Sequence, residues 1–115
     1  MLTLSRADGT SIVIQVGEIL DNTNAHEMTE AFGAASAAGY KRVILDMSEV
    51  CFISLTGVGC ILAALGTFRD KGGDIILCNL SGRIMHILEV LDLCNYLSIA
   101  SDVDEASEAI RPETA

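Results

Sequence analysis

The sequence predicts an α/β fold in which a mixed β-sheet of four to five strands packs against about four α-helices. Half of the 115 residues are apolar, which is enough to bury one continuous core without disulfides or metals. Apolar runs of strand length alternate with segments whose apolar residues recur every three or four positions. We therefore expect one domain over residues 1–115, with its core at 2–110 and a frayed tail at 111–115.

The first half of the chain is expected to form a hairpin, a helix and a buried strand. Residues 2–7 alternate weakly and precede an Asp-Gly turn signal, and β-branched residues then fill 11–16. A turn-rich stretch follows, and apolar side chains three or four apart in 25–35 predict an amphipathic helix that Gly39 ends. The run 43–46 is too continuously apolar for a half-exposed strand, so we place it in the middle of the sheet.

The second half is expected to alternate helices with strands. A second helix begins at Thr56 and ends near residue 70 at a Lys-Gly-Gly stop signal, and 74–78 is another buried strand. Ser81 caps a third helix, 96–99 forms a short edge strand, and Asp102 caps a last helix. The opening hairpin gives an antiparallel strand pair and the later strand–helix–strand units give parallel pairs, so the sheet is mixed.

Charge and hydropathy argue against binding to nucleic acid and against insertion into a membrane. The formal net charge is -9, from 16 acidic and 7 basic residues, and such a surface repels nucleic acid. It suits a basic protein partner or simply keeps the chain soluble. No run approaches the roughly 20 apolar residues of a membrane helix, and the first residues lack the pattern of a signal peptide. We expect no membrane insertion and a cytoplasmic location.

The chain offers no recognisable catalytic or metal-binding constellation. Its four cysteines stand singly, without a C-x-x-C pair, at Cys51, Cys60, Cys78 and Cys94. Their apolar neighbours indicate small core side chains in a reducing compartment. Neither histidine has a cysteine or serine near it that is arranged as a nucleophile. We therefore expect no metal, no cofactor and no enzymatic activity.

Residues 43–62 carry the most specific signal in the chain. They predict a buried strand, a loop over 48–54, and then a small polar residue and two glycines that open a helix. The free N–H groups and partial positive charge of a helix N-terminus stabilise a phosphate placed there. Gly57 and Gly59 lack the spacing of a nucleotide-binding loop, which favours close backbone packing as their reason.

This segment resembles the STAS family, named for sulfate transporters and anti-sigma antagonists. The family's usual pattern is a buried strand ending in Asp, a loop with an aromatic residue, and Asp-Ser-Ser/Thr-Gly-Leu/Val-Gly opening a helix. The matching residues are Leu45 and Asp46, Phe52, and residues 56–59. The resemblance extends over residues 2–110 and implies a STAS-like fold and a regulator that binds a partner without catalysis.

The chain departs from the family pattern at the phosphate acceptor. In the antagonists a Ser two positions before the first Gly of the motif accepts phosphate from the partner kinase, and Leu55 stands there. The resemblance therefore implies that the switch is absent or has moved to a neighbouring hydroxyl, Thr56 or, less well placed, Ser54. A helix cap at Thr56 and simple solvation of Ser54 are the competing interpretations. We favour no phosphorylation.

A second departure lies in residues 17–21, where family members have Gly-Glu/Asp-Leu-Asp with the last Asp at the partner-facing surface. One extra residue is present here, so Asp21 takes that place if the loop absorbs it, and Leu20 does if it does not. We favour Asp21. The resemblance thus implies a partner-binding surface, on which we expect Leu55 to be exposed or half-exposed. Its predicted members are Asp21, Asn22, Thr23, Ser54, Leu55, Thr56, Gly57 and Val58.

The resemblance also implies a class of partner. An anti-sigma factor antagonist binds an anti-sigma factor that is also a serine protein kinase of the histidine-kinase-like ATPase type, and a phosphatase reverses its phosphorylation. The alternative function is that of a STAS subunit in a transporter or lipid-trafficking ATPase complex. A small-molecule or nucleotide enzyme is a third class that no site chemistry in the sequence supports.

Overall fold

The computed structural model describes residues 2–7 and 10–109. Its centre is a five-stranded sheet with the strand order β1-β2-β4-β6-β7. These strands are β1 (Leu2–Ala7), β2 (Ser11–Val16), β4 (Arg42–Asp46), β6 (Asp74–Cys78) and β7 (Ser98–Ala100). β1 pairs with β2 antiparallel, and every later pair is parallel. The predicted mixed α/β sheet is confirmed.

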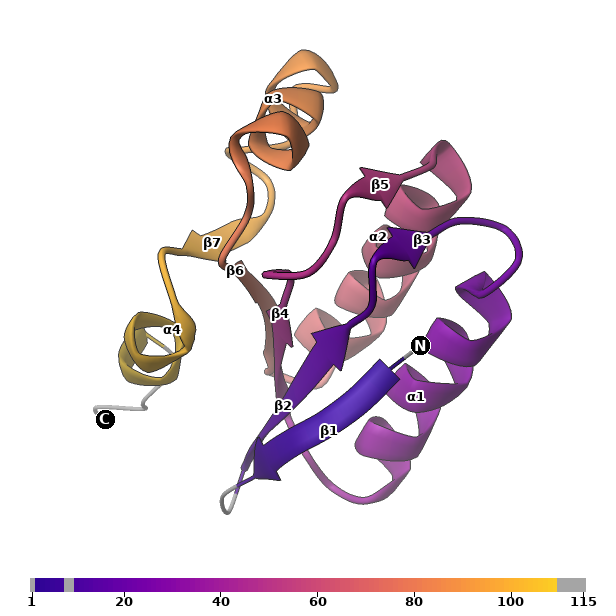
Figure 1. Cartoon of the computed structure of the whole chain (residues 1–115). Coiled ribbons are helices and arrows are strands. Elements are labelled where there is room, and N and C mark those ends of the chain that lie inside the picture. The colour runs from indigo at the N-terminus through magenta and orange to yellow at the C-terminus, as the bar shows by residue number, and fades with distance from the viewer. Residues whose placement is uncertain (1, 8–9, 110–115) are drawn as a thin grey trace.

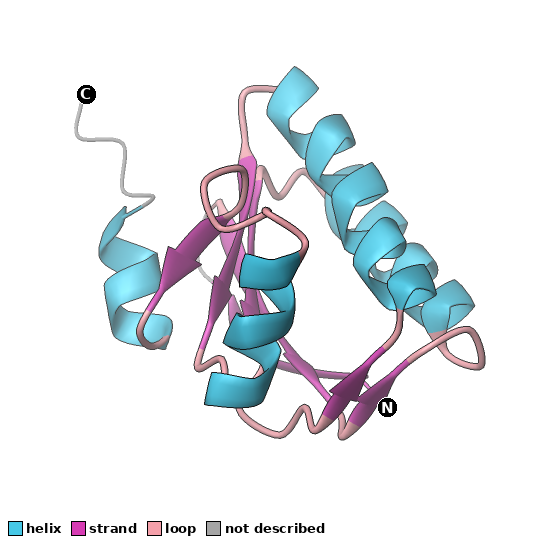
Figure 2. Ribbon diagram, turned by 90° about the horizontal axis from the view of Figure 1, so that it is seen from above, coloured by secondary structure: helices cyan, strands magenta, loops and turns pink. Residues whose placement is uncertain are grey.

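Helices cover both faces of this sheet unequally (Figures 1 and 2). One face carries α1 (Ala25–Ala37), α2 (Leu55–Asp70) and α3 (Gly82–Val90). The other face carries α4 (Val103–Ala109). The four helices of the described chain agree with the number expected from the sequence.

Strand side chains alternate between two cores, as the period of a β-strand requires. Ile14, Leu45 and Leu77 belong to the larger core with the three helices, whereas Val13 and Ile44 belong to the smaller core under α4. The three central strands are therefore buried on both sides, which explains their continuous apolar runs.

Local signals in the sequence place most of the helix ends correctly. The Ser81 hydroxyl accepts a hydrogen bond from the Ile84 amide at 3.2 Å, and the Asp102 carboxylate accepts one from the Glu105 amide at 2.8 Å. Gly39 has a φ of 96°, in the left-handed region where glycine is favoured, just beyond the end of α1. These caps confirm the predicted boundaries because each depends only on residues close in sequence.

The structure differs from the predicted elements in two short strands and in two boundaries. Two segments expected to be loops contain short strands, β3 (Ile19–Leu20) and β5 (Phe52–Ile53), which form a separate two-stranded sheet. The edge strand begins at Ser98 and not at residue 96, and α2 begins one residue earlier than expected, at Leu55. Such short elements are defined by pairing with distant segments, and this pairing leaves little local pattern. The predicted tail, 111–115, lies outside the described residues.

Candidate functional site

The pairing of β3 with β5 brings two distant segments of the chain together. The two strands run parallel, with Ile19 opposite Phe52 and Leu20 opposite Ile53. The Phe52 amide donates to the Glu18 carbonyl at 3.2 Å, and the Ser54 amide donates to the Leu20 carbonyl at 3.0 Å. The loop after β3 and the start of α2, which the sequence assigned to one surface, therefore lie side by side (Figure 1).

Ser54 caps α2. Its hydroxyl accepts a hydrogen bond from the Gly57 amide at 3.2 Å, and its backbone is extended, with φ -96° and ψ 169°. The cap expected at Thr56 is therefore wrong, because the helix begins at Leu55 and Thr56 is already its second residue. Thr56 is exposed on the first turn of α2. The two candidate hydroxyls thus differ, since only that of Ser54 holds the helix start.

Gly57 allows α2 to approach β3 closely. A Cβ atom placed on Gly57 would lie 2.7 Å from the Leu20 carbonyl oxygen and 2.9 Å from the Leu20 Cγ. Close packing, expected for both glycines, is confirmed for Gly57, but Gly59 has no atom within 4 Å of such a Cβ. Gly57 is buried by this contact. Gly57 therefore lies beneath the exposed residues of the predicted surface and is not itself accessible to a partner.

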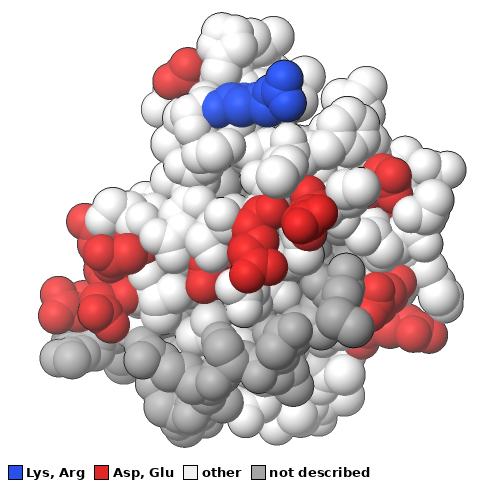
Figure 3. All heavy atoms as spheres, in the orientation of Figure 1, with Lys and Arg blue, Asp and Glu red and all other residues white. Residues whose placement is uncertain are grey.

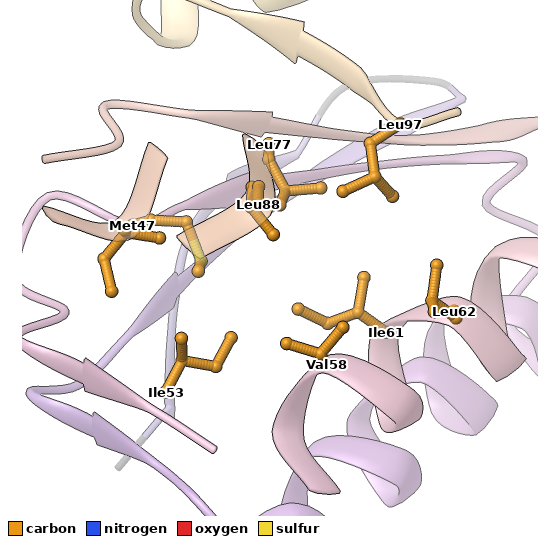
Figure 4. Close-up of a pocket in the computed structure, with 9 residues that line it drawn as sticks. Met47, Ile53, Val58, Ile61, Leu62, Leu77, Leu88 and Leu97 are labelled. Atoms are coloured by element: carbon orange, nitrogen blue, oxygen red, sulfur yellow. The ribbon is translucent and has the colours of Figure 1, made fainter. Parts of the chain in front are cut away.

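Val58 faces the interior and not the solvent. Its side chain is 6% exposed and lines an internal void of about 10 Å³ together with Ile53. Figure 4 shows both side chains pointing toward this void, which nine apolar residues line. A void of this size, without a polar group, is too small and too apolar to hold a ligand. Val58 can therefore support the surface only from below.

The loop after β3 is held by its own side chains. The Asp21 carboxylate accepts hydrogen bonds from the Thr23 hydroxyl at 2.6 Å and the Thr23 amide at 2.9 Å. These bonds, the hydroxyl one first, lower the pKa of Asp21 below its ordinary value because they favour the charged carboxylate. Leu20 is 1% exposed, whereas Asp21 is partly exposed, so Asp21 is the accessible one of the two residues considered for the partner-facing position. The next residue, Asn22, is exposed.

Three large apolar side chains are exposed at this end of the molecule. Leu55 is 73% exposed, in agreement with its predicted exposure, Phe52 is 51% exposed and Ile19 is 47% exposed. Ile19 and Phe52 are not among the residues predicted for the surface. In both β3 and β5 the first of two apolar residues is exposed and the second is buried. Two residues are too few for the sequence to distinguish such a surface residue from a core residue.

The cysteines do not all lie in the core. Cys78 is buried, and this burial, helped by the Asp46 and Asp102 carboxylates, raises the pKa of its thiol to about 12. Cys60 and Cys94 are half-buried, and Cys51 is exposed, which corrects the prediction for that residue.

Within the described residues, no group of three or more His, Cys, Asp or Glu side chains could hold a metal. None of the described helices is both long and apolar enough to cross a bilayer.

Two bacterial proteins are similar in sequence to this chain over most of its length. BtrV of Bordetella bronchiseptica, a candidate anti-sigma factor antagonist, is 24% identical over 110 residues, covering 96% of this chain and 94% of BtrV. The anti-sigma-B factor antagonist of Listeria monocytogenes is 24% identical over 98 residues, covering 85% of this chain and 86% of the relative.

Solved structures share the fold at low sequence identity. The anti-sigma factor antagonist SpoIIAA in its unphosphorylated form superposes with a TM-score of 0.83 at 19% identity, and all of both chains is covered. A murine anion transporter, Slc26a9, superposes with a TM-score of 0.76 at 18% identity, covering 92% of this chain but only 18% of the transporter. The profile of the STAS domain matches residues 2–106, so the chain belongs to the STAS domain family.

Proposed function

We propose that this chain is an anti-sigma factor antagonist, which binds an anti-sigma factor through the surface made by the 21–23 loop, β5 and the start of α2. Relatives with this name cover nearly the whole chain. The observation that carries the proposal is Leu55, a large apolar side chain that is 73% exposed on the first turn of α2. Burial of such a side chain against a partner is favourable, whereas its exposure to water is not.

The partner in this proposal is an anti-sigma factor that is also a serine protein kinase of the histidine-kinase-like ATPase type. Its capture releases a sigma factor. In a switchable antagonist, a phosphate adds about two negative charges at the docking surface and blocks binding. Leu55 has no hydroxyl, and the Ser54 hydroxyl is engaged as the helix cap. The chain therefore acts as a constitutive binder, and Thr56 is the residue modified if any phosphate is transferred.

The second candidate function is that of a subunit or domain in a transport complex. The likeness to a domain of Slc26a9 favours it, because the same fold occurs there within a much larger chain. In that role the domain needs no phosphate acceptor, which fits the presence of Leu55 at the acceptor position. The gene neighbourhood separates the two functions: a kinase or phosphatase gene supports the antagonist, and permease or ATPase genes support the transport subunit.

Titration calorimetry of the purified chain with the anti-sigma factor encoded nearest its gene tests the proposal. We expect wild-type protein to bind and Leu55→Asp to weaken the complex by about 2 kcal/mol, or roughly 30-fold, because a charge would enter a desolvated contact. Val90→Asp is the matched control, because Val90 is 69% exposed but lies at the end of α3. Equal affinities of Leu55→Asp and wild type would contradict the proposed surface.

A further inference from the structure

We propose that the partner presents a basic rim around an apolar hollow, and that it covers the outer face of the β3–β5 sheet. The inference rests on the proposed function and specifies the chemistry of the partner. It depends on two features of the described chain: an apolar face that nothing in it covers, and carboxylates beside that face that form no ion pair with any described cation.

The apolar face is the outer side of a two-stranded sheet. Ile19 and Phe52 are opposite each other in the parallel register, and both are about half exposed. Their neighbours Leu20 and Ile53 point the other way, into the core. Leu55 follows Phe52 after three residues and is the most exposed of these apolar side chains. The face therefore offers a partner three large apolar contacts from two segments that the β3–β5 pairing holds in register.

The apolar face adjoins an acidic hollow. This hollow has a volume of about 480 Å³, and the carboxylate residues along it are Glu18, Asp21 and Glu49. It also includes Ile19 of the apolar face, and none of its lining residues is basic. Glu18 and Glu49 are exposed and form no ion pair with any described residue, and the hydrogen-bond partners of Asp21, Thr23 and Asn24, are neutral. Asp21 is charged at neutral pH, as an ordinary aspartate is, and the bonds from Thr23 lower its pKa further.

Most basic residues of the described chain lie at the other end of α2. No Lys or Arg occurs in residues 10–40 or 43–68, the segments that build the surface. Lys41 bonds the Lys71 carbonyl, and Arg69 pairs with Asp74, beside the C-terminal end of α2. The 16 residues of α2 span about 24 Å, well beyond the Debye length of about 8 Å at physiological salt. These cations therefore do not compensate the hollow.

The negative charge of the hollow limits which kinds of molecule can bind this face. A second copy of this chain would bring a further set of the same carboxylates against the first, and like charges at an interface are costly. A nucleic acid would be repelled by the same groups. In the view of Figure 3, acidic side chains are widespread and basic ones are confined to one small patch. A protein with Lys or Arg around an apolar pocket is the occupant that complements both parts of the surface.

The two parts of the surface have separable kinetic effects. Carboxylates at the rim of an interface accelerate encounter with a basic partner, and salt weakens this effect. Buried apolar anchors instead set the dissociation rate. We therefore expect Glu18→Gln/Glu49→Gln to slow association about fivefold at low salt with little change in dissociation. Phe52→Ala is expected to speed dissociation about tenfold or more.

Stopped-flow kinetics of the full chain with the anti-sigma factor used above tests the inference, at about 0.02 M and about 0.5 M salt. The charge control is Asp70→Asn/Glu108→Gln, which removes two exposed carboxylates far along the chain from the hollow. Circular dichroism verifies that each variant is folded. The inference predicts slower association for Glu18→Gln/Glu49→Gln alone, and a convergence of all association rates at high salt.

The outcomes separate this inference from the proposed function. Tight binding of wild type whose association rate is independent of salt and of Glu18 and Glu49 would overturn the basic rim and leave the antagonist assignment standing. Unchanged dissociation of Phe52→Ala would overturn the apolar contact. Failure of wild type to bind the anti-sigma factor at all would overturn both proposals. Self-association that Phe52→Ala abolishes would assign the face to a second copy of the chain.

Discussion

Ser54 and Leu55 are neighbours in the sequence with opposite orientations at the start of α2. The Ser54 hydroxyl turns back to bond the Gly57 amide, whereas the Leu55 side chain extends into solvent. The first interaction stabilises the helix, and the second exposes apolar area that the isolated chain does not bury. At this junction the Ser54 hydroxyl therefore has a structural role, and the Leu55 side chain is available to bind a partner.

Removal of the Ser54 hydroxyl is expected to destabilise the fold. Ser54→Ala leaves the Gly57 amide without its partner, and the loss of an N-cap costs about 1 kcal/mol. Thr56→Ala is the control, since Thr56 is an exposed residue within the helix, and we expect its unfolding free energy to change by less than about 0.5 kcal/mol. Urea denaturation measures both. A larger loss for Thr56→Ala than for Ser54→Ala would show that Thr56 is the cap after all.

At the scale of the element, the site depends on the junction between the β3–β5 sheet and α2. The start of α2 lies against the Leu20 backbone because Gly57 has no side chain. This contact fixes where Leu55 emerges relative to Ile19 and Phe52. The sheet and the helix therefore position the exposed side chains as a unit.

Substitution of Gly57 is expected to break this junction. The Cβ of Gly57→Ala would lie 2.7 Å from the Leu20 carbonyl oxygen, so β3 or the helix start must shift, at a cost of about 1–3 kcal/mol. Gly59→Ala is the matched control, because it meets no atom within 4 Å and should stabilise α2 by about 0.5–1 kcal/mol. Thermal unfolding compares the two variants. Equal melting temperatures would mean that the β3–α2 contact yields without strain.

At the scale of the whole molecule, local patterns predict the main sheet and fail at the small one. Continuous apolar runs indicate the buried strands β4 and β6, and helix periodicity with capping residues indicates the helices. β3 and β5 have two residues each, too few for any periodicity, and each exists because its partner lies beside it. Ile19 and Phe52 therefore could not be recognised as a surface pair from the sequence.

The predicted surface shows the same division between local and long-range information. The family motif places Leu55 at a helix start, and the structure exposes it as expected. The motif does not reveal that Gly57 and Val58 are buried beneath it, or that Ser54 is the cap, because these follow from one-residue details of the helix start. Sequence similarity locates the region, and packing decides which of its side chains a partner can touch.

We propose that an anti-sigma factor binds this end of the molecule, and not the second exposed apolar region around Val90 and Tyr96. Hydrogen–deuterium exchange of the chain with and without the anti-sigma factor tests it most directly. We expect the partner to slow exchange in residues 17–24 and 51–58 and to leave 87–97 unchanged. Slower exchange confined to 87–97, with 17–24 and 51–58 unaffected, would contradict it.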